Sequence, residues 1–122
     1  MVLSWVQLAS LFMFLGITLG AFGSHALRDK ISPQSLEIFK TGIFYHLIHA
    51  LGLFVVAWLT TNSSDPKIHF AGLAFMTGIF LFSGSLYLLA ITETKMIGII
   101  TPLGGLCFLA GWFLIMHSQI KI

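Results

Sequence analysis

The sequence predicts an all-α membrane protein, a transmembrane four-helix bundle whose helices run up, down, up and down. Two observations predict this class. Apolar residues make up 57% of the 122 residues and charged residues only 8%, whereas soluble domains carry about 25% charge. The charges also cluster, which leaves residues 1–27, 41–64, 68–92 and 96–120 without any. Each of these gaps exceeds the roughly 20 residues that a helix needs to cross about 30 Å of hydrocarbon.

We expect a single domain, residues 1–122, with spans at approximately 2–22, 41–59, 68–90 and 97–117. The first span has no Lys or Arg before it and is long for a signal peptide, so we expect a retained helix. The alternation that membrane β-strands require is absent.

The connections between the spans are short and polar. Ser32 is a good N-cap and Pro33 suits the first helical position. We therefore expect the second helix to begin near Pro33 and to lie along the membrane interface, with Leu36 and Phe39, before it enters the bilayer. Residues 60–67 form a polar turn, and residues 92–95 join the last two helices as a tight antiparallel hairpin.

Basic residues predict the orientation of the chain in the cell membrane. Loops one and three hold Arg28, Lys30, Lys40 and Lys95, whereas the opposite side holds Lys67 and Lys121. The positive-inside rule therefore places loops one and three in the cytoplasm and both termini outside. Net charge is only +2 and the basic residues form no patch, so we expect no nucleic-acid partner.

Small residues mark the faces on which the helices pack, because helices in a bilayer associate through close packing and hydrogen bonds. The candidate helix-packing residues are Gly16, Gly20, Gly78, Gly84, Gly104 and Gly111. They would serve packing within the bundle or the seam of a homo-oligomer. Pro102 lies inside the predicted fourth helix, where it should kink the helix or open it onto a cavity.

Polar residues gather in the half of the bundle next to loop one. The candidate site residues are His25, Tyr45, His46, His49, Ser83, Ser85 and Thr101. His46 and His49 are three residues apart and so share a helix face. Three interpretations stay open: hydrogen bonds that tie helices together, a site for a proton or small polar ligand, and a metal or haem site.

Several motifs follow one another in the order that is typical of one family. They are residues 20–27 (GAFGSHAL), 41–51 (TGIFYHLIHAL), 82–87 (FSGSLY), 100–105 (ITPLGG) and 110–112 (AGW). With them the chain resembles the small bacterial membrane family catalogued as domain of unknown function 423, which is related to the eukaryotic transmembrane protein 256. The resemblance implies a multi-span membrane protein and supplies no catalytic residues.

Function is predicted only as a set of hypotheses. The first is an integral membrane protein that handles a proton or a small ligand. The alternative is a structural or accessory subunit of a larger membrane assembly, and the third is an intramembrane metal or haem protein. No nucleophile, base and orienting group stand out as a set, so we expect no enzyme. No cofactor is predicted, and the lipid bilayer, a second copy or another membrane protein are the candidate partners.

Overall fold

A computed structural model describes residues 3–120, and every element in this range is helical. The first helix comprises α1 (Trp5–Thr18), the π-helical segment η1 (Leu19–Gly23) and α2 (Ser24–Leu27). The second is α3 (Pro33–Asn62). The third comprises α4 (Pro66–Gly78), the π-helical segment η2 (Ile79–Ser83) and α5 (Gly84–Thr92). The fourth comprises the 3₁₀ segment η3 (Lys95–Ile99) and α6 (Thr101–Met116).

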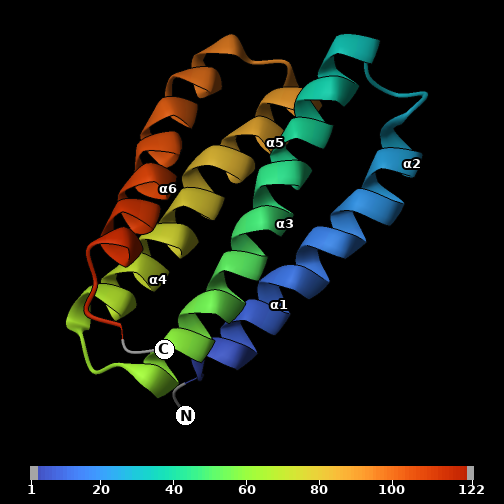
Figure 1. Cartoon of the computed structure of the whole chain (residues 1–122). Helices are drawn as coiled ribbons and strands as arrows, with labels where there is room; N and C mark the ends of the chain where they lie inside the picture. Colours follow the sequence, from blue (N-terminus) through green and yellow to red (C-terminus); the bar gives the residue numbers. More distant parts are fainter. Residues whose placement is uncertain (1–2, 121–122) are drawn as a thin grey trace.

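The four helices contain 23, 30, 27 and 22 residues, and each is long and apolar enough to cross a membrane. The prediction of an all-helical chain with four candidate spans is therefore confirmed. The second and third helices extend beyond the predicted spans at both ends, whereas the first runs from Trp5 to Leu27 and the fourth from Lys95 to Met116. The predicted start of the first span, Val2, lies outside the described residues. Figure 1 shows the chain reversing direction at each connection, so that the start of α1 and the end of α6 lie at one end of the molecule.

Side chains fix where the helices begin and end. Ser4 forms a capping box with Gln7 at the start of α1, and the Ser32 hydroxyl accepts a hydrogen bond from the Ser35 amide at the start of α3. Asp65 caps α4 directly before Pro66. At the end of α5, Glu93 adopts the left-handed conformation (φ 53°) that stops a helix.

The start of α3 differs from the prediction. The helix begins at Pro33, as predicted, but it continues without a break through Asn62 and does not turn along the interface. Phe39 is 1% exposed, and its ring lies 5.1 Å from that of Tyr87 on α5. The physical reason is that Phe39 packs inside the protein, so the first turns of α3 belong to the bundle.

The proline of the fourth helix also differs from the prediction. Pro102 lies in the first turn of α6, after the 3₁₀ segment η3 and a turn at Ile100. In a first turn the missing amide hydrogen has no intrahelical partner to lose, and the fixed φ of proline suits the helix. Pro102 therefore starts α6 instead of kinking it.

The second and third helices form the centre of the bundle. In the apolar stretch of α3, 56% of the residues are buried. The share is 33% in the third helix and 17% in each of the two outer helices. The main packing pairs are α1 with α3, α3 with α4 and α5, and α6 with α4 and η2. Figure 1 accordingly shows α1 and α6 on opposite sides of the central pair.

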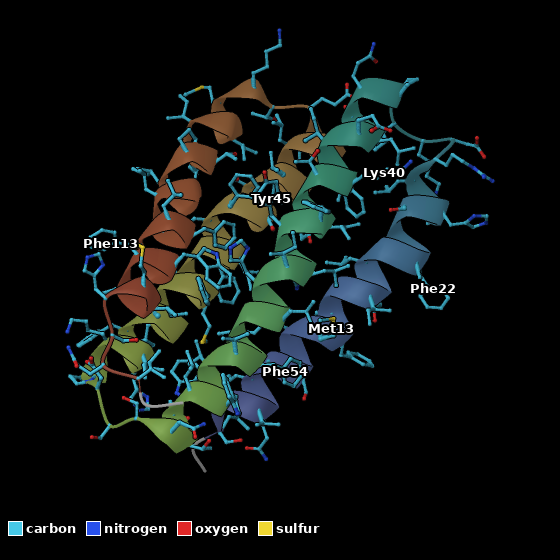
Figure 2. The ribbon with its side chains drawn as sticks, viewed as in Figure 1. Met13, Phe22, Lys40, Tyr45, Phe54 and Phe113 are labelled. Carbon is cyan, nitrogen blue, oxygen red and sulfur yellow. The ribbon has the colours of Figure 1, made fainter. Side chains whose placement is uncertain are left out.

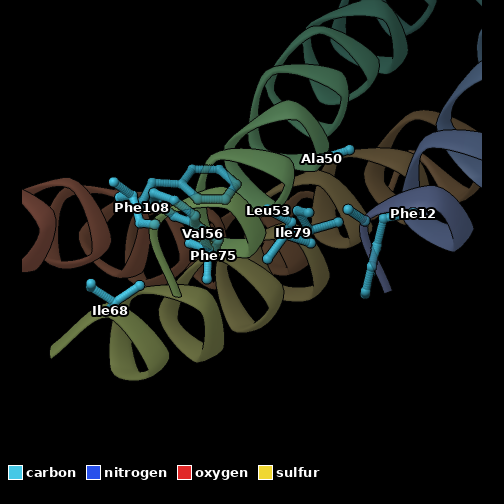
Figure 3. Close-up of a cluster of buried hydrophobic side chains, with 10 residues drawn as sticks. Phe12, Ala50, Leu53, Val56, Ile68, Phe75, Ile79 and Phe108 are labelled. Atoms are coloured by element: carbon cyan, nitrogen blue, oxygen red, sulfur yellow. The ribbon is translucent and has the colours of Figure 1, made fainter. Parts of the chain in front are cut away.

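The apolar core lies between these helices in the half next to loop two. Its buried members come from α1, α3, α4, η2 and α6, and include Phe12, Leu53, Val56, Phe75 and Phe108 (Figure 3). Large apolar side chains also cover the outside. Figure 2 shows Phe22 and Phe113 projecting from opposite sides of the molecule, and these rings are 73% and 57% exposed. Such a surface is suited to lipid rather than water.

Candidate functional site

His46 connects three helices through its two ring nitrogens. It is 4% exposed on α3. Its Nε2 lies 2.7 Å from the Phe12 carbonyl oxygen of α1, and its Nδ1 lies 2.8 Å from the Tyr87 hydroxyl of α5. A carbonyl oxygen only accepts, so Nε2 carries the hydrogen. Nδ1 of the neutral ring then accepts a hydrogen bond from Tyr87.

His49 has the opposite arrangement. It is also 4% exposed. Its Nδ1 lies 2.8 Å from the Tyr45 carbonyl oxygen, and its Nε2 accepts a hydrogen bond of 3.0 Å from the indole N–H of Trp112 on α6. The hydrogen is therefore on Nδ1, because the carbonyl only accepts and the indole only donates. The imidazole also stacks on Phe108, with ring centroids 3.5 Å apart and planes 5° apart.

The two histidines therefore point to different neighbours. His46 joins α3 to α1 and α5, whereas His49 joins α3 to α6. All four ring nitrogens have partners, which leaves no nitrogen lone pair free for a metal ion. Within residues 3–120, no three or more His, Cys, Asp and Glu side chains are grouped as a metal site would require.

The hydroxyl groups of the polar half also link helices. Ser83, fully buried in η2, donates to the Gly42 carbonyl of α3 at 2.6 Å. Ser85 donates to the Phe82 carbonyl at 2.8 Å and lies 2.6 Å from the Thr101 hydroxyl. Since the single hydroxyl hydrogen of Ser85 is already used, Thr101 is the donor between these two residues. This bond joins α5 to the start of α6.

The side chains of His25 and Tyr45 take no part in these buried hydrogen bonds. His25 is exposed on α2. Gly23 and Leu27, two residues to either side, pack toward Phe39 of α3. Residues two apart do not share a helix face, so His25 points away from the bundle. Tyr45 is 37% exposed, and within residues 3–120 its hydroxyl makes no hydrogen bond.

The predicted packing glycines fall into two groups. Side chains or backbone of another helix lie directly against five of them: Gly16, Gly20, Gly78, Gly104 and Gly111. Gly84 is different, because a Cβ atom there would meet only the Ile79 carbonyl oxygen of its own helix, at 3.9 Å. The five glycines are thus used for packing inside one copy of the chain, and Gly84 faces open space.

Three important residues were not among the predicted site residues. Tyr87 and Trp112 supply the partners of the two histidines, and the available signals were their depth within the spans and their place in the motifs at 82–87 and 110–112. Glu93, next to loop three, accepts a hydrogen bond of 2.9 Å from Ser35 near the start of α3. No local motif predicts this last contact, because the two residues are 58 positions apart.

At the opposite end, outside the membrane spans, Asp65 fixes the segment that follows α6 to loop two. Its carboxylate accepts hydrogen bonds from the backbone amides of Gln119, at 2.7 Å, and Lys67, at 3.0 Å. The Ser63 hydroxyl donates to the Gln119 carbonyl. The bond from the Gln119 amide, followed by that from the Lys67 amide, holds the pKa of Asp65 below its ordinary value.

Comparison with known proteins decides the family. A model described as "Protein of unknown function (DUF423)" matches residues 19–105, which is more than half of the chain. The chain belongs to the DUF423 family. Among its relatives, the UPF0382 membrane protein YwdK of Bacillus subtilis is 43% identical over 118 residues, which cover 96% of each chain. The UPF0382 inner membrane protein YgdD of Escherichia coli is 32% identical over 109 residues, which cover 89% of this chain and 83% of the relative.

Membership of the DUF423 family confirms an integral membrane protein, as the names of the relatives say. A Staphylococcus haemolyticus UPF0382 membrane protein, 35% identical over 117 residues, agrees. No solved structure matches the chain. The relation to eukaryotic transmembrane protein 256 stays a prediction.

Proposed function

We propose that this DUF423 protein is a structural or accessory subunit of a membrane assembly and acts through its outer surface. The observation that carries the proposal is the use of all four ring nitrogens of His46 and His49 in bonds within the bundle. Groups used in this way stabilise a fixed arrangement of helices. They are not free to bind a ligand or a metal ion without breaking that arrangement.

The other two hypotheses receive less support. A proton or polar-ligand site centred on His25, His46 and His49 needs these rings to face one space, yet His25 is exposed and the other two rings point to different helices. A metal or haem site needs free imidazole nitrogens. Every buried side-chain nitrogen and oxygen within residues 3–120 already has a hydrogen-bond partner. A tightly bonded interior favours the structural hypothesis.

Photo-crosslinking in native membranes tests the proposal. The photoreactive amino acid p-benzoylphenylalanine would replace one exposed phenylalanine at a time: Phe22 on the first helix, Phe80 on the third or Phe113 on the fourth. An accessory subunit presents one face to a protein, so we expect a discrete protein adduct at one position and lipid adducts at the other two. Lipid adducts alone at all three positions would rule out a stable protein partner on these faces.

We further propose that loops one and three face the cytoplasm and both termini face outward, because Lys and Arg are more frequent in loops one and three. Single cysteines at the exposed residues Ser64 and Thr94 report the two sides, in a chain that also carries Cys107→Ala. A membrane-impermeant maleimide should label Ser64→Cys in intact cells and Thr94→Cys only after permeabilisation. The reverse pattern would overturn the orientation.

A further inference from the structure

A groove runs along the side of the bundle between α3, η2 and the first half of α6. It encloses about 530 Å³, which is within the range of small-molecule sites. Its nine lining residues include Tyr45, His49, Phe82, Gly105, Phe108 and Trp112. Ile48 and Leu109, which also line it, are 37% and 67% exposed, so the groove opens sideways toward lipid. Figure 2 shows Tyr45 on the side of α3 that faces α6.

Rings make up most of the lining. Tyr45 lies 4.7 Å from Phe82, and the stacked rings of His49 and Phe108 lie behind it, each nearly parallel to Tyr45 at 10°. None of the nine lining residues carries a formal charge when His49 is neutral. Aromatic faces favour a flat ring as a partner, and the absence of charge excludes an ionic head group.

Only one polar group of the lining is available to a ligand. His49 and Trp112 use their polar atoms in bonds within the protein. The Tyr45 hydroxyl has no partner within residues 3–120, although it lies inside an apolar span. Tyr45 is five residues beyond Lys40, or roughly 7 Å deeper along the helix at 1.5 Å per residue. A hydroxyl at that depth gains from an acceptor supplied by a ligand.

Gly105 lines the groove and leaves room in it. A Cβ atom there would meet only the Phe82 ring, at 3.8–3.9 Å, which is ordinary contact. Packing of the bundle therefore does not require glycine at this position. A larger side chain would project into the groove and leave the contact between α6 and η2 intact.

From these contacts we propose that the groove binds the ring of a lipid-soluble quinone. One quinone carbonyl oxygen accepts a hydrogen bond from the Tyr45 hydroxyl, the flat ring packs on the aromatic lining, and the apolar tail extends into the bilayer. A quinone combines an uncharged flat ring, a carbonyl acceptor and entry from the lipid phase. A phospholipid lacks the ring and carries its charge at the interface. The proposal concerns binding and does not depend on the accessory role.

Quenching of Trp112 fluorescence by decylubiquinone tests the proposal in lipid nanodiscs. The chain carries Trp5→Phe and Trp58→Phe, which leaves Trp112 in the groove as the only tryptophan. We expect saturable quenching with one quinone per chain. Tyr45→Phe should weaken binding about three- to tenfold, the effect of one hydrogen bond. Gly105→Leu should abolish the saturable phase.

Gly84→Leu is the matched control, because no other helix lies against Gly84 and this residue does not line the groove. This variant should bind decylubiquinone as the parent does, and monodisperse elution of both leucine variants shows that they are folded. Linear quenching that is equal in the two variants would mean that the quinone only partitions into the bilayer, and would overturn the proposal. Displacement of decylubiquinone by equimolar dioleoylglycerol would also overturn it, because the groove would then take any uncharged lipid.

Discussion

Buried polar residues of this chain find partners on other helices. His46 and His49 come from one face of α3, yet their rings carry hydrogen on different nitrogens because different groups surround them. In hydrocarbon an unpaired polar group has no water to replace a lost partner. Each of the bonds between helices therefore favours one arrangement of the helices over the alternatives, even where its net contribution to the free energy of folding is modest.

The two tyrosines allow a matched test of one bond. Tyr87→Phe removes the donor to Nδ1 of His46 and leaves that nitrogen buried without a partner. We expect a loss of about 1 kcal/mol in the free energy of unfolding. Tyr45→Phe is the control, since its hydroxyl bonds to nothing within residues 3–120, and we expect a change near zero.

Unfolding by sodium dodecyl sulfate in mixed micelles measures both tyrosine variants. Equal stability of Tyr87→Phe and wild type would mean that the His46–Tyr87 contact is too weak to hold α3 and α5 together. A double variant with His46→Ala separates the pair from its surroundings, because residues in contact give non-additive effects.

The polar half of the bundle could be predicted in part from the sequence. Depth along each span singled out His46, His49, Ser83 and Ser85, and the structure buries all four inside the bundle. Depth could not exclude His25 from the candidate site residues. The side of the first helix on which a residue lies after the π-helical segment η1 depends on how that helix packs on α3. Hydrogen-bond partners likewise come from other helices, so spacing within one helix does not reveal them.

At the scale of elements, glycines set the distance between helices. The third and fourth helices approach each other closely where α6 begins, since a Cβ atom on Gly104 would overlap the backbone nitrogen of Phe82 in η2. The π-helical segment η2 lies at this contact and also carries Ser83, which bonds to α3. Single π-helical turns often occur where an α-helix adjusts to a local contact of this kind.

Neighbouring glycines provide a test of this contact. Gly104→Ala places a methyl group against the backbone of Phe82 and must separate α6 from η2, so we expect a loss of roughly 3 kcal/mol in the free energy of unfolding. Gly105→Ala places its methyl group in ordinary contact with the Phe82 ring, and we expect it to be within about 1 kcal/mol of wild type, on the stabilising side. Thermal unfolding in detergent compares them. Similar melting temperatures would contradict the close approach.

The four helices could be predicted at this scale because charged residues are excluded from hydrocarbon. The uncharged stretches of the sequence therefore mark the spans directly. Two features depended on tertiary packing instead. The start of α3 belongs to the bundle because Phe39 is buried against Tyr87, and Pro102 begins α6 because η3 precedes it as a separate 3₁₀ turn. The apolar character of a residue in the sequence does not show whether its side chain faces lipid or another helix.

At the scale of the whole molecule, polar contacts at both ends hold the outer parts of the chain to the central helices. Glu93 and Ser35 join loop three to the start of α3. At the other end, Asp65 joins the chain beyond α6 to the connection between α3 and α4. The fourth helix, which is buried on few sides, is thereby fixed at its end as well as along its length.

The Asp65 contact should depend on pH. The folded pKa of Asp65 lies below its ordinary value of about 3.9, so the ionised form is the one that the fold favours. Its contribution to stability is fully present above the ordinary pKa and is lost as the pH falls through the folded pKa. We expect Asp65→Asn to lose part of the decline in melting temperature that wild type shows below about pH 4. Identical pH profiles would contradict a role for this carboxylate.

Neutral histidines with fixed hydrogen positions hold the four helices together. Solid-state NMR of the ¹⁵N-histidine-labelled protein in bilayers at neutral pH tests it most directly, with His46→Gln and His49→Gln used to assign the signals. We predict that His46 carries its hydrogen on Nε2 and His49 on Nδ1. Either ring doubly protonated, or both rings in the same tautomer, would contradict the account.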